Sequence, residues 1–266
     1  MDSNERYKLL HALLIDNPYH FYWFDKTDGG MVTRYNFNKT EDGVKDFKVI
    51  FSFTAAPAYR GSSGVYSVSS SKVKAAQAAA KAASSVVSQN ASKSDYEKLA
   101  AYNDYICRNT DYNRDALTAN TDYGDPWQLI YVFDGDVSTK VVCEGYAKAF
   151  QYLCDLSSFS DAECYSVSGV LNSGIGHMWN IVRIGGQNYL VDVTNNDSHY
   201  SYAGNYQYLF LRGGLGTPAS GYSIQNIKYT YYNEMLQLYG QNDNSVLKIS
   251  GTDYTLRRCG RRLPLR

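Results

Sequence analysis

Three residues of this 266-residue chain have the types and spacing of a thiol-based catalytic site: Cys143, His177 and Asp192. Cys143 opens a predicted helix, CEGYAKAFQYL, after a turn-rich approach. A thiol at the N-terminus of a helix lies beside unpaired backbone N–H groups and the positive end of the helix dipole, and both favour the thiolate. The same N–H groups can stabilise an oxyanion that forms on a substrate carbonyl. The position therefore suits a nucleophile.

His177 and Asp192 lie on two predicted strands joined by Gly185-Gly186, a dipeptide typical of tight hairpin turns. A turn centred on this dipeptide places Trp179 opposite Asp192. His177 lies two residues before Trp179 on the same face, so it is a diagonal neighbour of Asp192, within reach of an imidazole–carboxylate hydrogen bond. The opposite face is nearly all apolar and is expected to be core. We therefore expect the helix of Cys143 to pack on the face that carries the polar pair.

These residue types define a reaction. Asp192 would fix the imidazole tautomer and stabilise its charged form, while His177 would take the proton of Cys143 and later deliver one to a leaving amine. Cys143 would attack an amide or acyl carbonyl and form a thioester. Each residue alone has an ordinary alternative, because a buried cysteine is usually an inert core residue and a histidine beside an aspartate is often a structural pair. Only their conjunction points to catalysis.

The segments that carry these residues resemble the core of the transglutaminase-like superfamily of cysteine enzymes. The resemblance covers about residues 95–195 and rests on VVCEGYAKAFQYL (141–153), VSG (167–169), GHMWNIVRI (176–184) and YLVDVT (189–194). Cys, His and Asp follow in that order there with short separations, whereas a papain-type enzyme has its His ~130–150 residues after its Cys. The resemblance implies that Cys143 is the nucleophile, His177 the base and Asp192 its orienting partner.

The resemblance also implies the elements that must position these residues: an α+β fold with a papain-like core, in which the nucleophile helix packs on an antiparallel sheet. Apolar spacing predicts helices at 4–16, 68–93, 94–108, 142–157 and near 229–239. It predicts strands or extended segments at 19–24, 31–37, 46–54, 163–170, 177–184, 188–194 and 206–211, with a loop at 60–65. We expect an N-terminal α/β region (1–92) packed on a catalytic core (93–256), and a disordered basic tail (257–266).

Three further residues are predicted to bind substrate. Glu144 adjoins the nucleophile, Trp179 follows the base, and Trp127 lies upstream, where its indole N–H could be a second oxyanion donor unless the ring is simply packed. The sequence departs from the family at Met178, where a small residue is usual, and at Asn195, where a tryptophan is common. Both positions adjoin the predicted cleft, so the substrate preference stays open.

Composition limits the partners. The 26 Lys and Arg balance the 26 Asp and Glu, but five arginines lie in the last ten residues, which leaves the body mildly acidic. That charge argues against a nucleic-acid binder that relies on bulk positive charge. No apolar run reaches the ~20 residues of a membrane span. The five cysteines have no C-x-x-C spacing, so we expect neither a metal site nor a cofactor.

We expect a cysteine-dependent acyl-transfer enzyme acting on a peptide or protein amide. No calcium-loop signature is present, and the resemblance to the bacterial branch of the superfamily implies hydrolysis rather than glutamine–lysine cross-linking. The alternative is a surface module that binds peptide or glycan without turnover, which the 26 tyrosines would suit. The intact Cys–His–Asp set speaks against that alternative. Abundant Tyr with sparse Lys and Glu is common in secreted bacterial chains, so an extracellular or cell-surface location is expected.

Overall fold

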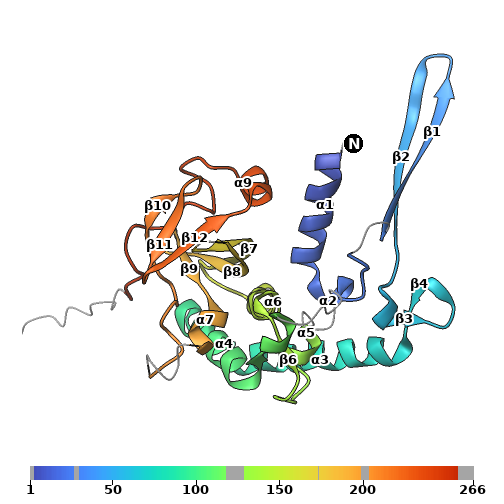
Figure 1. Cartoon of the computed structure of the whole chain (residues 1–266). Coiled ribbons are helices and arrows are strands. Elements are labelled where there is room, and N and C mark those ends of the chain that lie inside the picture. Colours follow the sequence, from blue (N-terminus) through green and yellow to red (C-terminus); the bar gives the residue numbers. More distant parts are fainter. Residues whose placement is uncertain (1–2, 27–29, 118–128, 173, 199–203, 257–266) are drawn as a thin grey trace, which may run out of the picture.

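The computed structural model describes residues 3–26, 30–117, 129–172, 174–198 and 204–256. It is a mixed α and β structure, in which helices pack on one face of a curled, six-stranded antiparallel sheet (Figure 1). A long N-terminal hairpin extends away from this body (Figure 1). The predicted tail, 257–266, lies outside the described residues.

The chain begins with α1 (Ser3–Asp16), as its leucine spacing predicts, and continues into α2 (Pro18–Phe21). The prediction of an extended segment at 19–24 is therefore wrong for most of its length. Pro18 occupies the first turn of α2, where its fixed φ suits a helix and its missing N–H removes no helical hydrogen bond.

Two hairpins follow in the N-terminal region. The first pairs β1 (Met31–Thr40) with β2 (Gly43–Phe53), close to the two predicted strands. The second pairs β3 (Arg60–Gly61) with β4 (Gly64–Val68), so the predicted loop at 60–65 contains strand residues. Its backbone N–H and C=O groups find partners across the hairpin rather than in water.

Two helices, α3 (Ser70–Gln89) and α4 (Asp95–Asn109), confirm the predictions for this part of the chain. A capping box begins α4: the Ser94 hydroxyl accepts the Glu97 N–H at 3.4 Å, and the Glu97 carboxylate accepts the Ser94 N–H at 2.9 Å. Two unpaired N–H groups are thereby satisfied, which explains why the helix starts there.

The next elements lead into the helix that carries Cys143. They are α5 (Leu129–Val132), β5 (Asp111–Tyr112), which pairs in parallel with β6 (Lys140–Val141), and α6 (Cys143–Asp155). Gly145 is required in the first turn of α6, because a Cβ there would lie 2.6 Å from the Cβ of Val141. Because glycine has no Cβ, the residues that precede α6 can pack closely against its first turn.

The central sheet has the strand order β10-β11-β12-β7-β8-β9, and every pairing is antiparallel. Its strands are β7 (Glu163–Leu171), β8 (Ile175–Ile184), β9 (Gln187–Val191), β10 (Leu215–Thr217), β11 (Gly221–Ile224) and β12 (Ile227–Tyr231). The predicted register of the β8–β9 hairpin is confirmed, since Asn180 pairs with Val191 and Ile184 with Gln187.

One expectation about the faces of this hairpin is wrong. The α6 helix packs on the face that carries Asn180 and Val182, where the Asn180 side chain donates to the carbonyl of Ala147 at 3.0 Å. The face of Trp179 is instead covered by residues of β11 and β12, because the sheet curls over it and forms a second core cluster. His177 lies at the rim of that cluster, stacked on Trp179.

Two predicted strands change near the C-terminus. The strand at 188–194 ends at Val191, and α7 (Val193–Ser198) follows because the Asp192 carboxylate caps it, accepting the Asn195 N–H at 3.1 Å. The segment 206–211 is not a strand, although its apolar residues are buried, because its backbone groups pair with an irregular set of partners. The predicted helix near 229–239 is α9 (Asn233–Tyr239).

One hydrophobic core spans the predicted boundary between residues 92 and 93. Ala79 and Ala83 of α3 share a cluster with Leu99 of α4 and Phe150 of α6, and all four are almost completely buried. The α3 helix therefore belongs to the core that supports the candidate site.

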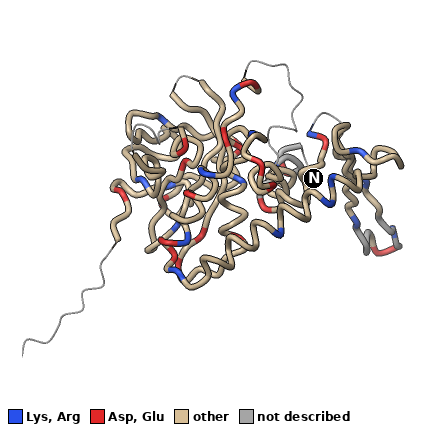
Figure 2. The backbone as a smooth tube through the Cα atoms, turned by 90° about the horizontal axis from the view of Figure 1, so that it is seen from below, with Lys and Arg blue, Asp and Glu red and all other residues tan. Residues whose placement is uncertain are grey.

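Acidic and basic residues are interspersed along the described backbone (Figure 2). None of the helices among the described residues has both the length and the apolar character needed to cross a membrane.

Candidate active site

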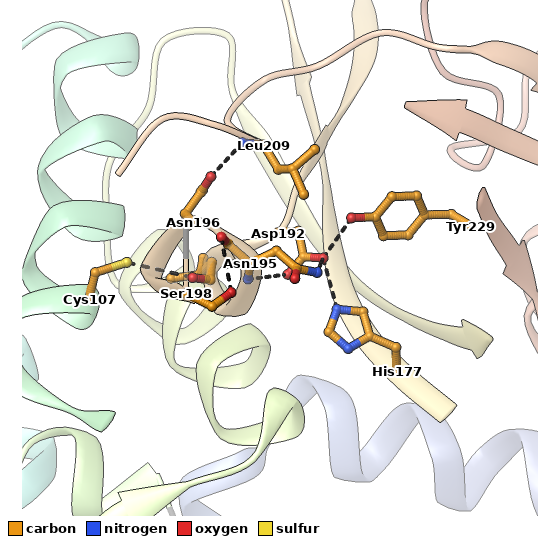
Figure 3. A network of polar contacts seen from close by, with 9 residues as sticks. Cys107, His177, Asp192, Asn195, Asn196, Ser198, Leu209 and Tyr229 are labelled. Carbon is orange, nitrogen blue, oxygen red and sulfur yellow. Dashed lines mark hydrogen bonds and ion pairs between the residues drawn. The ribbon is translucent and has the colours of Figure 1, made fainter. Parts of the chain in front are cut away.

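His177 and Asp192 form a direct hydrogen bond, as the hairpin register predicts (Figure 3). Nε2 of His177 lies 2.8 Å from Oδ2 of Asp192. His177 is near the start of β8 and Asp192 directly follows β9, so the strand pairing brings together residues 15 positions apart. The Asp192 side chain is completely buried, and that of His177 is 7% exposed. The ring nitrogen Nδ1 of His177 is left for another partner.

Asp192 has further partners that the sequence did not reveal. Tyr229 donates its hydroxyl to Oδ2 at 2.8 Å, and the side-chain amide of Asn195 donates to the same oxygen at 2.7 Å (Figure 3). Burial opposes ionisation of Asp192, but the charge and hydrogen bond of His177, with the bonds from Asn195, lower its pKa. These donors satisfy a carboxylate that has been removed from water.

The imidazole of His177 is held in its charged form. Burial alone would lower the pKa of His177, but the charge and hydrogen bond of Asp192, with a smaller contribution from Cys143, raise it to about 10. An imidazole with this pKa carries its proton at neutral pH. The arrangement therefore favours an imidazolium ion beside the cysteine.

Cys143 lies at the N-terminus of α6 and is half-buried. Its thiol lies close enough to His177 to help raise the pKa of the imidazole. Among the described residues, no side chain caps this end of α6, where Val142 is the N-cap. The Gly145 N–H already donates to the Val142 carbonyl at 2.9 Å, so the N–H groups before it in the turn are the ones that face an anion next to the sulfur.

Trp179 supports the histidine from behind. Its ring stacks on that of His177, with centroids 6.1 Å apart, and meets the ring of Tyr229 edge-on at 5.1 Å. Trp179 is 1% exposed, so its burial disfavours the predicted contact with substrate. The ring fixes the imidazole plane instead.

Glu144 is held by two lysines. Its Oε1 accepts Lys26 Nζ at 2.9 Å and Lys148 Nζ at 2.5 Å. Burial opposes its ionisation, yet the charges of Lys148 and Lys26 lower the pKa of Glu144 to about 2. These ion pairs tie the N-terminal segment to α6 beside Cys143, and a contact of Glu144 with substrate stays a prediction. Trp127 lies outside the described residues.

The two asparagines that replace the expected tryptophan have structural partners. Asn195 bonds Asp192 as described above. Asn196 donates to Oδ1 of Asn103 on α4 at 2.8 Å. It also accepts the Leu209 N–H at 2.5 Å (Figure 3). This network joins α7 to α4 and to the following segment, and so fixes the position at which Asp192 leaves the sheet.

Sequence reasoning missed Tyr112 and Tyr229, and it placed Asn195 beside the cleft without predicting its bond to Asp192. Burial and the charge of Cys143 raise the pKa of Tyr112 to about 12, so this tyrosine lies near the thiol. The pairing of Tyr112 with Val141, just before α6, brings it there. In the described part of the chain, no group of three or more His, Cys, Asp or Glu side chains is arranged to hold a metal ion.

Replacing Tyr229 with phenylalanine is expected to lower the free energy of unfolding by about 1.5–3 kcal/mol, because a buried carboxylate loses a hydrogen-bond donor. Tyr231→Phe is the matched control. Its hydroxyl is also buried but donates to the neutral carbonyl of Leu247 at 3.4 Å, so about 1 kcal/mol is expected. Urea unfolding measures both, and equal losses would contradict a special role for the Tyr229–Asp192 bond.

The raised pKa of His177 predicts how its charge affects stability. Below the ordinary pKa of histidine, the ring is protonated in both folded and unfolded chains, and the stabilisation from the raised pKa is fully present. It is lost as the pH rises through about 10, where the folded chain gives up the proton. NMR of the ring nitrogens should therefore show a protonated ring at neutral pH, and a neutral ring there would contradict the prediction.

Comparisons with known proteins add little to this geometry. No family model matches the sequence, and no curated protein matches it. A solved structure described as a TGase is similar to this chain with a TM-score of 0.39 and 16% sequence identity. The likeness covers 73% of this chain and 48% of that one, so the chain spans about half the length of the structure it matches. A likeness at that level does not assign a function, which must come from the chain's own residues.

Proposed function

We propose that this chain is a cysteine-dependent acyl-transfer enzyme with a transglutaminase-like core, which cleaves peptide or protein amides through a thioester on Cys143. The observation that carries the proposal is the buried His177–Asp192 hydrogen bond of 2.8 Å, with a half-buried thiol within reach of the same imidazole. A purely structural histidine–aspartate pair would not need a cysteine at an uncapped helix start beside it.

In the first step, the Cys143 thiolate attacks the carbonyl carbon of the amide. The oxyanion that forms accepts hydrogen bonds from the N–H groups of the first turn of α6. His177, protonated and held by Asp192, donates its proton to the leaving nitrogen as the C–N bond breaks. An amine departs, and the acyl group remains on sulfur as a thioester.

In the second step, an acceptor attacks the thioester. His177 is now neutral and removes a proton from the acceptor, which is a water molecule in hydrolysis or a primary amine in transfer. The carbon–sulfur bond breaks, and the thiolate–imidazolium pair forms again. We favour hydrolysis, so the chain is proposed as a peptidase or amidase.

A peptide-library digest tests this proposal. The chain is incubated with the library, with and without a small primary amine, and Cys143→Ala is treated in parallel. Cleavage that needs Cys143 supports a peptidase or amidase. Amine incorporation without cleavage would replace hydrolysis by transfer. If the products of the two proteins are identical, the enzyme proposal fails and a binding module is left.

A further inference from the structure

A pair of thiols lies at the end of α6 that is opposite to Cys143. Cys154 is in the last turn of α6 and Cys164 is near the start of β7, and both are buried free cysteines. Cys154 follows Cys143 by eleven residues, which is about 16 Å along a helix. The pair is thus too far from the candidate active site to take part in its chemistry.

The packing of α6 on β7 brings these two thiols together. The side chain of Gln151 accepts the N–H of Ser166 at 2.6 Å, which fixes helix against strand. Cys154 is on the same face of α6 as Gln151, three residues on, and Cys164 is on the same face of β7 as Ser166, two residues back. Cys154 lies about 4.5 Å along the helix from Gln151, and Cys164 lies about 6.6 Å along the strand from Ser166. Both displacements are toward the short connection between α6 and β7.

The environment of Cys164 agrees with this placement. Burial, and next the proximity of Cys154, raise the pKa of the Cys164 thiol well above its ordinary value. By contrast, the buried thiol of Cys107 donates to the backbone carbonyl of Val193 at 3.6 Å. Cys154 therefore lies close enough to Cys164 to affect its pKa, and both residues belong to one hydrophobic cluster.

A groove lies beside this pair, and both cysteines contribute to its lining. It has a volume of about 600 Å³, and its lining includes Cys154, Cys164, Asp155, Glu163 and Tyr165. The two carboxyl side chains in the lining favour binding of a neutral or cationic small molecule over an anionic one. The groove therefore suits a small disulfide that carries amino groups rather than carboxylates.

We propose that Cys154 and Cys164 are a redox site, which a low-molecular-weight amino disulfide converts into an intramolecular disulfide between α6 and β7. One cysteine thiol first loses its proton, and its sulfur attacks the small disulfide. A mixed disulfide forms, and the small thiolate that is released takes up a proton. The second cysteine thiolate then attacks the protein sulfur of the mixed disulfide and releases the other small thiol. The two cysteines together lose two electrons and two protons, and the small disulfide is reduced to two thiols.

The bond would hold the last turn of the nucleophile helix to the central sheet. It closes a loop of only eleven residues, yet constraining even a short loop in the unfolded chain stabilises the folded one. The melting temperature is expected to rise by about 5 °C on oxidation. This role is independent of any chemistry at Cys143.

Peptide mapping tests the proposal without an activity assay. Trypsin cuts after Lys148 and Arg183, and the peptide 149–183 contains both cysteines and no other. The folded chain is treated with cystamine, blocked with iodoacetamide and digested without reduction. The expected peptide is lighter by two hydrogen atoms than its reduced form and carries no alkyl group. The same treatment in urea shows that the reagent is active.

Two results would overturn the proposal. One is a peptide with both cysteines alkylated, and the other is a peptide that retains a small thiol on either cysteine without closing the bond. Cys107, in the peptide 99–108, is the matched buried control. It is expected to react with cystamine more slowly than Cys154 and Cys164 do. Cys154→Ser should leave peptide 149–183 unable to lose two hydrogen atoms. None of these readouts depends on Cys143, so the two proposals can fail separately.

Discussion

Replacing Cys143 with alanine is expected to lower kcat/KM for amide cleavage by at least about 10,000-fold, the largest effect of any single substitution in this chain. The substitution removes the only atom that forms a bond with the acyl group, and the helix N-terminus and His177 alone supply little rate. A discontinuous assay with a peptide from the library digest measures the change. Because alanine fits in place of a half-buried cysteine, the folded structure should persist.

Cys154→Ala is the matched control for this prediction. It makes the same chemical change in the same helix, at a buried position far from the imidazole. Cys154→Ala is expected to lower the free energy of unfolding by about 1 kcal/mol, while kcat stays within about threefold of the unsubstituted chain. Equal losses of activity in the two variants would show that folding, and not the nucleophile, was lost.

Replacing Asp192 with asparagine is expected to lower kcat by about 1,000- to 10,000-fold. The amide keeps the shape of the carboxylate but removes its charge, and burial then lowers the pKa of His177, which the Asp192 charge otherwise raises to about 10. The imidazolium beside Cys143 is lost at neutral pH. The Tyr229 hydroxyl and the Asn195 amide both donate to Oδ2 of Asp192. An NH2 group in place of that oxygen could not accept these two hydrogen bonds.

Asp197→Asn separates this effect from a general loss of acidic charge. Asp197 lies in α7, the short helix that Asp192 caps. It accepts the Tyr146 hydroxyl at 2.7 Å, and burial raises its pKa to about 6. The carboxylate that bonds His177 is that of Asp192, so kcat is expected to change less than about threefold in Asp197→Asn. An NMR titration should show a lowered His177 pKa in Asp192→Asn only. An unchanged pKa there would contradict the electrostatic account.

Sequence alone predicted the parts of the site that depend on local chain geometry. The Gly185-Gly186 turn fixes the register of β8 and β9, and that register brings His177 to Asp192. The start of α6 at Cys143 follows from the apolar spacing of the helix after a turn-rich segment. Both features depend on residues close together in the chain, which is why a sequence pattern can express them.

The rest depends on partners that are distant in the chain. Tyr229 reaches Asp192 across 37 residues because β12 pairs with β7, and no local pattern encodes that pairing. The predicted strand 188–194 ends before Asp192, because the Asp192 side chain caps α7. A side chain that bonds the backbone of a nearby turn competes with strand formation, even where the sequence favours a strand. Similarly, both faces of β8 are apolar, so period-two alternation could not tell which one receives α6.

The central claim is that Cys143 is an activated nucleophile, and its alkylation rate tests that claim most directly. The chain is treated with iodoacetamide at neutral pH, and the tryptic peptide 141–148, which holds Cys143 and no other cysteine, is followed over time. An activated Cys143 should react about tenfold faster than a low-molecular-weight thiol, most of which is protonated at that pH. A rate no faster than that of the free thiol would contradict the account.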